Sequence, residues 1–243
     1  MFALLIISAE LLLYGPYNWY SREYKKHDVQ SHMIKEISHE SLLAVTDEMM
    51  EYLRGRREDL VIEAERDGVM QEFFTDREKA HMEDVRGLFI AGIVASRVAI
   101  GICVSILIYL LVAGHKQKKA RRSAINTVLE TAAPEQLPTA KPSPFSLLAG
   151  SFIGTSVVVF VSSIAISALF ASDFTKYFVK FHHIFFDNDL WILYQDKDDM
   201  INMLPEGFFS DTALAIVVIF LIFVVLLIII SIAIIRRSHP KAS

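Results

Sequence analysis

Two histidines lie close to long apolar stretches, in surroundings that suit proton transfer. His81 stands in EKAHMED, residues 78–84, and His182 stands in FHHIFFD, residues 181–187. Histidine titrates near neutral pH, so a pair that faces one water–lipid boundary can move protons during attack on an ester or amide. The two motifs therefore predict proton-transfer chemistry at a membrane surface.

The elements that must position these histidines are membrane helices. Of the 243 residues 53% are hydrophobic, and three apolar stretches are long enough to cross about 30 Å of hydrocarbon at about 1.5 Å per helical residue. A shorter apolar run starts at Phe2, and we expect it to form a first transmembrane helix that continues to about Tyr20. The expected fold class is an all-α integral membrane protein, a single membrane domain over residues 1–243, with four transmembrane helices at 2–20, 88–112, 145–171 and 212–235.

Positive charge is concentrated on one side of this arrangement. Basic residues gather between the second and third spans and in the C-terminal tail: Lys116, Lys118, Lys119, Arg121, Arg122, Lys141, Arg236, Arg237 and Lys241. By the positive-inside rule these residues face the cytoplasm. We therefore expect cytoplasmic termini, a cytoplasmic linker at 113–144, and external segments at 21–87 and 172–211. The basic cluster then sets topology at an anionic leaflet, and no nucleic acid partner is expected.

Cysteine usage and motifs exclude several kinds of site. Cys103 is the only cysteine and falls within the second span, which excludes an intrachain disulfide and a zinc–thiolate site. The chain has no HExxH motif and no glycine-rich phosphate loop. We expect neither a cofactor nor a metal, so the chemistry falls to ordinary side chains.

The first external segment carries two helix signals. Apolar residues recur at helical spacing from Ile34 to Leu53, with Gly55 after them, and predict an amphipathic helix that serves as a structural lid or as a wall for acyl chains. Thr75 and Glu78 have the spacing of a capping box. A helix should therefore start near Thr75 and run unbroken into the second span.

That second helix carries His81 between two carboxylates. Glu78 lies one turn before it and Asp84 about one turn after it. Either carboxylate can orient the imidazole and raise its basicity, although a solvated helix face would show the same pattern.

The second external segment is typical of a helix that lies in the membrane interface. On a helical wheel four phenylalanines share a narrow arc: Phe174, Phe178, Phe181 and Phe185. His182 falls at the edge of this arc, roughly 80° from its centre at about 100° per residue, whereas His183 points toward water. The geometry favours His182 over His183 as the functional residue.

Other polar and aromatic residues have a structural and a functional interpretation. Five aromatic residues near span boundaries are typical of headgroup anchors: Tyr17, Trp19, Tyr20, Trp191 and Tyr194. Residues 187–189 are expected to form a turn. Alternatively, they hold the amine of a substrate. Glu10 and Arg97 are charged residues inside predicted spans. Because such residues are usually paired or functional, we expect an ion pair that fixes the register of the two helices.

Several motifs together resemble one family. NWYSREY at 18–24, FFTDREKAHMEDV at 73–85, FHHIFFDNDLW at 181–191 and LPEGFF at 204–209 are similar to the motifs of the Lit family, the lipoprotein intramolecular transacylases of the bacterial plasma membrane. The resemblance covers most of the chain outside the cytoplasmic linker.

The resemblance implies a substrate and a reaction. The substrate would be a mature lipoprotein whose N-terminal cysteine carries a diacylglyceryl group and a free α-amine, set among membrane lipids. The sn-2 acyl chain would move to that amine and give the lyso-form lipoprotein. Carried onto this sequence, the catalytic histidines are His81 and His182. Supporting roles are expected of Glu78, Asp84, Tyr17, Asn18, Asp187, Asn188, Trp191, Glu10 and Arg97.

A mechanism and two alternatives follow. His81 would act as base, steadied by Glu78 or Asp84, and His182 as acid, although the order of the two histidines can be reversed. The first alternative is a metal-dependent membrane hydrolase that uses His81, His182 and nearby carboxylates as ligands. The second is a non-catalytic membrane scaffold in which the histidines cap helices or sense pH.

Overall fold

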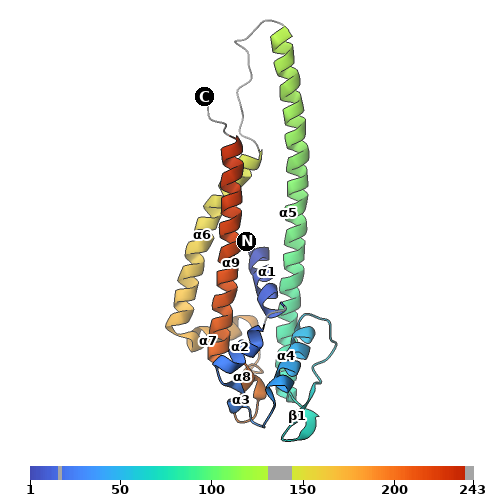
Figure 1. Ribbon diagram of the computed structural model, residues 1–243, viewed down its shortest axis with the longest axis vertical. Helices are drawn as coiled ribbons and strands as arrows, with labels where there is room; N and C mark the ends of the chain where they lie inside the picture. Colours follow the sequence, from blue (N-terminus) through green and yellow to red (C-terminus); the bar gives the residue numbers. More distant parts are fainter. Residues whose placement is uncertain (16–17, 131–143, 239–243) are drawn as a thin grey trace. The chain divides into compact units, whose positions relative to one another are not determined.

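The computed structural model describes residues 1–15, 18–130 and 144–238. These residues form helices and one two-stranded sheet (Figure 1): α1 Phe2–Leu13, α2 Trp19–Lys26, α3 Val29–His32, α4 His39–Leu53, β1 Glu63–Arg66, β2 Val69–Glu72, α5 Asp76–Glu130, α6 Pro144–Ser172, α7 Phe174–Phe185, α8 Asp199–Met203 and α9 Glu206–Ser238. The chain divides into two compact units, Met1–Ser96 with Ser163–Phe220, and Arg97–Ser162 with Leu221–Ser243. Both histidines belong to the first unit.

Three helices are long and apolar enough to cross a membrane: α5, α6 and α9. They contain the predicted spans 88–112, 145–171 and 212–235. However, α5 continues to Glu130, so residues 113–130 are helical where a linker was predicted. This part of the chain is rich in lysine, arginine and alanine, which are good helix formers. The rest of the predicted linker, 131–143, lies outside the described residues.

The first apolar helix differs from the prediction. α1 ends at Leu13 rather than near Tyr20, and a separate helix, α2, begins at Trp19. The sequence explains the break, because proline lacks the N–H that a helix needs and disfavours helical backbone in the residue before it, here Gly15 before Pro16. The described residues therefore contain three candidate spans and one shorter apolar helix, where the sequence predicted four spans.

A β-hairpin before α5 was not predicted. β1 and β2 pair antiparallel, with Arg66 opposite Val69. Asp67 and Gly68 connect them, with φ angles of 54° and 76°. A two-residue turn with both φ values positive strongly favours Asp-Gly, and its twist matches that of paired strands. The expectation of an all-α protein was wrong here because this turn signal was overlooked.

The amphipathic helix predicted from Ile34 to Leu53 is present as α4, but it begins at His39, so Ile34 and Ile37 lie before it. Ser38 caps it by accepting a hydrogen bond from the Ser41 amide at 3.0 Å, and Gly55 follows its end with a φ of 78°. Its apolar face belongs to the core of the first unit, which also includes residues of α2, α8, the hairpin and the start of α5: Trp19, Tyr24, Leu42, Val45, Met49, Leu53, Ile62, Phe73, Met82 and Met203. α4 thus packs over the region where α5 begins.

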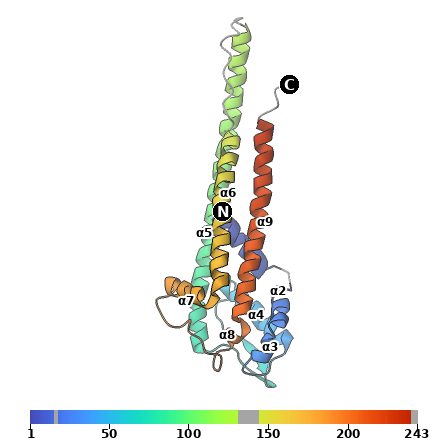
Figure 2. The same ribbon diagram turned by 90° about the vertical axis from the view of Figure 1, so that its left-hand side faces the viewer.

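The helix predicted from the phenylalanine arc is α7. Asp173 begins it, because the Asp173 carboxylate accepts a hydrogen bond from the Lys176 amide at 3.1 Å. Figure 2 shows α7 turning away from the end of α6. Its placement in the membrane interface remains a prediction.

Candidate active site

The first unit brings His81 and His182 together. Their ring centroids lie 6.0 Å apart, with an angle of 37° between the ring planes. Each residue is only 6% exposed. The ring of Phe186 lies against both, with centroids 5.3 Å from His81 and 5.5 Å from His182. Two histidines separated by about a hundred residues therefore share one apolar enclosure, whereas His183 is exposed.

The predicted capping box positions His81. The Thr75 amide donates to Glu78 at 2.6 Å and the Glu78 amide donates to the Thr75 hydroxyl at 3.3 Å. These reciprocal bonds fix the first turn of α5, and His81 stands in the second. Because both bonds are local, the sequence was sufficient to predict them.

Glu78 is engaged with backbone groups rather than with the imidazole of His81. Besides the Thr75 amide, its carboxylate accepts a hydrogen bond from the Met200 amide at 2.6 Å. Glu78 thus joins the start of α5 to α8. It positions His81 by fixing the backbone of α5 rather than by contacting the imidazole. This differs from the predicted contact with the ring.

A backbone carbonyl defines the tautomer of His182. Nδ1 of His182 lies 2.8 Å from the carbonyl oxygen of Phe178, one turn earlier in α7. A carbonyl oxygen only accepts, so Nδ1 carries the proton and, in the neutral ring, Nε2 holds the free lone pair. The ring of Phe178 packs against the imidazole with centroids 4.1 Å apart. His182 is therefore held in a form that can accept a proton.

Burial keeps both imidazoles uncharged at neutral pH. Loss of hydration, and next the proximity of His182, lowers the pKa of His81 from 6.5 to about 4, against the opposing effect of Asp84. Burial also lowers the pKa of His182, although its hydrogen bond to Phe178 opposes the shift. Nδ1 of His81 is buried without a hydrogen-bond partner, so no contact at this nitrogen fixes the tautomer of the ring.

Trp191 was predicted as a headgroup anchor but packs on the histidines. Its ring centroid lies 4.8 Å from that of His182 and 5.2 Å from that of His183. Its indole nitrogen is buried and has no hydrogen-bond partner. Buried donors are nearly always paired in native proteins, so this N–H is one of the few buried donors that remain available to an acceptor.

An open hollow of about 380 Å³ adjoins the pair. Phe186, which contacts both histidines, lines it together with Asp84, Gly87, Leu88, Phe185, Asp187 and Asn188. The side-chain amide of Asn188 donates to the Asp84 carboxylate at 2.8 Å. The hollow therefore presents carboxylates next to aromatic side chains.

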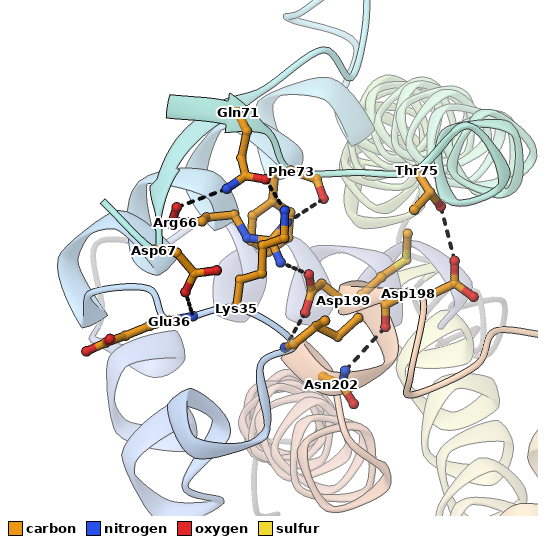
Figure 3. A network of polar contacts seen from close by, with 12 residues as sticks. Lys35, Glu36, Arg66, Asp67, Gln71, Phe73, Thr75, Asp198, Asp199 and Asn202 are labelled. Atoms are coloured by element: carbon orange, nitrogen blue, oxygen red, sulfur yellow. Dashed lines mark hydrogen bonds and ion pairs between the residues drawn. The ribbon is translucent and has the colours of Figure 1, made fainter. Parts of the chain in front are cut away.

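A polar network holds the chain around the site (Figure 3). The Arg66 guanidinium of β1 forms a buried ion pair with Asp199 of α8 and also donates to the Phe73 carbonyl. The Thr75 hydroxyl donates to Asp198 at 3.1 Å. These contacts tie the hairpin and the start of α5 to the segment that follows Trp191. Sequence reasoning missed them, because nothing local pairs residues 133 positions apart.

Other predicted residues lie on other elements. Glu10 is in α1, Asn18 is the N-cap of α2, and Arg97 belongs to the second unit, while Tyr17 lies outside the described residues. Their supporting roles, and the ion pair of Glu10 with Arg97, remain predictions. Trp19 was predicted as an anchor, but it is buried and its indole donates to the Thr212 hydroxyl at 3.2 Å.

The fold is similar to that of a membrane protein of solved structure. The chain resembles the membrane-integral lipoprotein intramolecular transacylase Lit from Bacillus cereus, with a TM-score of 0.67 and 20% identity over 97% of this chain and 90% of that chain. A variant of that protein with one histidine replaced by alanine gives a TM-score of 0.63 and 19% identity, over 97% and 88% of the two chains. At this identity the likeness shows the fold, that of a multi-pass membrane protein.

Sequence comparisons identify the family. A search of curated proteins found no match. The family model for the lipoprotein intramolecular transacylase Lit matches residues 1–209. This range contains His81, His182, Trp191 and every residue of the hollow beside them. The chain therefore belongs to the lipoprotein intramolecular transacylase (Lit) family.

Proposed function

We propose that this chain moves the sn-2 acyl chain of a diacylglyceryl-modified lipoprotein to the α-amine of its N-terminal cysteine, by proton transfer through His81 and His182. The observation that carries the proposal is the pair of buried imidazoles with ring centroids 6.0 Å apart, whose pKa values burial lowers. In this reaction a C–N amide bond forms, the sn-2 C–O ester bond breaks, and one proton passes from the nitrogen to the departing oxygen. A neutral pair can relay that proton without a net change of charge.

The tautomer of His182 supports the second of the two orders that the sequence left open, with His182 as base. Nδ1 of His182 donates to Phe178, so Nε2 is the acceptor and His182 serves as the base. His81, whose Nδ1 has no partner, returns a proton to the sn-2 oxygen. Because amine and ester belong to one molecule, holding them in contact supplies much of the acceleration without an acyl-enzyme intermediate.

The hollow beside the pair receives the substrate headgroup. An α-amine with a pKa near 8 is mostly protonated at neutral pH, and Asp84 and Asp187 provide charges that attract an ammonium. Phe181, Ile184 and Phe185 are exposed on α7 and suit contact with acyl chains. With both termini cytoplasmic, as the basic residues predict, this site opens at the extracytoplasmic face.

The indole N–H of Trp191 completes the site. An ester carbonyl oxygen becomes negatively charged during attack and needs a hydrogen-bond donor. The Trp191 donor has no acceptor of its own and lies on a ring packed against His182. Solvent does not reach this nitrogen, so the ester must displace a covering side chain to meet it.

Trp191→Phe is expected to lower the rate of acyl transfer by about 10²–10³-fold, the usual effect of removing one donor to an oxyanion. Phenylalanine keeps an aromatic ring, although a smaller one, beside His182, so substrate affinity should change less than the rate. Tyr194→Phe, which removes the hydroxyl of an exposed ring, is the control. A Trp191→Phe protein that works at the wild-type rate would remove Trp191 from the mechanism.

The pH dependence should follow the substrate rather than the histidines. The pKa of His81 is lowered to about 4, so the ring is already neutral from pH 5 upward. The α-ammonium, with a pKa near 8, must lose its proton first. Burial also lowers the pKa of His182, the proposed base, below its usual value, so we expect kcat/KM to rise about tenfold per pH unit between pH 6 and 7. A break near pH 6.5 in the purified protein would show an unshifted histidine instead.

Expression in a bacterium that lacks lipoprotein N-acylation tests the proposal. Mass spectrometry of a lipoprotein N-terminus should show an acylated α-amine and one remaining ester. A membrane hydrolase would instead remove a chain and leave the amine free, and a scaffold would leave the lipid form unchanged. Either of those outcomes would reject the proposal.

A further inference from the structure

A second group of ionisable side chains joins α2 to the start of α9. Glu23 and His27 follow each other by one turn, and Asp211 stands in the second turn of α9. One oxygen or nitrogen atom from each of the three residues lies within 4.8 Å of the other two. All three belong to the first unit, and none takes part in the proposed acyl transfer.

Glu23 carries a buried oxygen without a hydrogen bond. Its side chain is 3% exposed, and Oε2 accepts no hydrogen bond. This oxygen lies 3.5 Å from Nε2 of His27 and 3.8 Å from Nζ of Lys26, and both distances are too long for a hydrogen bond. A buried carboxylate oxygen in this state is costly and calls for a partner directed at it.

The imidazole of His27 is fixed with Nε2 toward both carboxylates. Nε2 lies 2.7 Å from the Asp211 carboxylate. The ring rests directly on Gly207 in the first turn of α9, where an added Cβ would come 2.4 Å from Cε1. Glycine at this position therefore makes room for the ring.

Lys26 is the cation that competes for this group. Its ammonium lies 2.5 Å from the Asp211 carboxylate, but its side chain is 53% exposed. A flexible, half-exposed lysine can turn to solvent at little cost. Two carboxylates then remain beside the imidazole, and one divalent cation balances their charge.

We propose that Glu23, His27 and Asp211 form a binding site for one Zn²⁺ ion, which ties α2 to α9. Imidazole nitrogen and carboxylate oxygen are both donors that Zn²⁺ binds at about 2.0–2.2 Å, and three protein ligands leave the fourth position to water. The ion gives the buried Glu23 oxygen a closer partner than Nε2 of His27 at 3.5 Å or Nζ of Lys26 at 3.8 Å. The site is distinct from His81 and His182.

Calorimetric titration of the metal-stripped, detergent-solubilised chain with ZnCl₂ tests the site. Wild type should bind one ion. Glu23→Gln and His27→Gln should each weaken binding at least about tenfold, since even outer-shell changes around metals cost 10–100-fold. Lys26→Met should bind zinc more tightly than wild type, because the competing ammonium is gone. A simple ion-pair cluster gives no such gain.

His39→Gln is the matched control, because His39 contacts Ser21 elsewhere on the surface and its loss should leave zinc affinity unchanged. If neither wild type nor Lys26→Met binds one ion, the site does not exist. Binding that survives Glu23→Gln and His27→Gln but is lost with His81→Ala would overturn the proposal in favour of a metal at the histidine pair.

Discussion

His182→Phe is expected to lower the rate of acyl transfer by about 10²–10⁴-fold, the range that a positioned general acid or base contributes. Phenylalanine keeps a ring between Phe178 and Phe186, which pack on His182 at centroid distances of 4.1 and 5.5 Å, so the fold should survive. What is lost is the Nε2 lone pair that the Phe178 hydrogen bond leaves free. Steady-state rates on a purified diacylglyceryl lipopeptide measure the effect.

His183→Phe is the control for that experiment. His183 is adjacent in sequence but exposed, and its replacement should leave the rate close to that of wild type. Equal losses in the two variants would mean that the helix needs imidazole for packing or solubility. Full activity of His182→Phe would contradict the proton relay.

Arg66→Met is expected to destabilise the first unit by about 3–5 kcal/mol, because it leaves Asp199 as a buried charge without its partner. The exposed fractions of the two side chains are 5% and 4%. The same change should lower activity, since Asp199 and its neighbours hold the segment that follows Trp191. Thermal unfolding in detergent, followed by far-UV circular dichroism, measures the loss.

Two further variants separate the cost of leaving Asp199 as a buried, unpaired charge from the small cost of losing an exposed ion pair. Arg57→Met breaks the pair with Glu48, whose side chains are 32% and 46% exposed, and should cost at most about 1 kcal/mol. Arg66→Met combined with Asp199→Asn removes the stranded charge and should recover much of the stability. If Arg66→Met costs no more than Arg57→Met, the network does not hold the site.

The sequence was sufficient for features that depend on local spacing. Helical periodicity placed His182 at the edge of the phenylalanine arc, and the structure buries it while His183 is exposed. The capping box placed His81 near the start of an unbroken helix. Both predictions rest on residues within one or two turns of each other, where the backbone geometry is known in advance.

Features that depend on distant contacts were missed or misread. The ion pair of Arg66 with Asp199 joins two segments that no periodicity relates. Trp191 is of a residue type that often anchors helices at the membrane interface. Only its packing on His182 indicates a place in the candidate site. The hairpin at Asp67 and Gly68 is a different case, because its turn signal was visible in the sequence and was overlooked.

The most direct test uses a diacylglyceryl lipopeptide with an isotopically labelled sn-2 chain, mixed with an unlabelled lipopeptide of different peptide mass. With the wild-type protein, mass spectrometry should find the label on the α-amine of the labelled peptide only, and a protein lacking both His81 and His182 should leave both peptides unchanged. Label on the amine of the other peptide, or transfer that continues without the two histidines, would contradict an intramolecular reaction run by this pair.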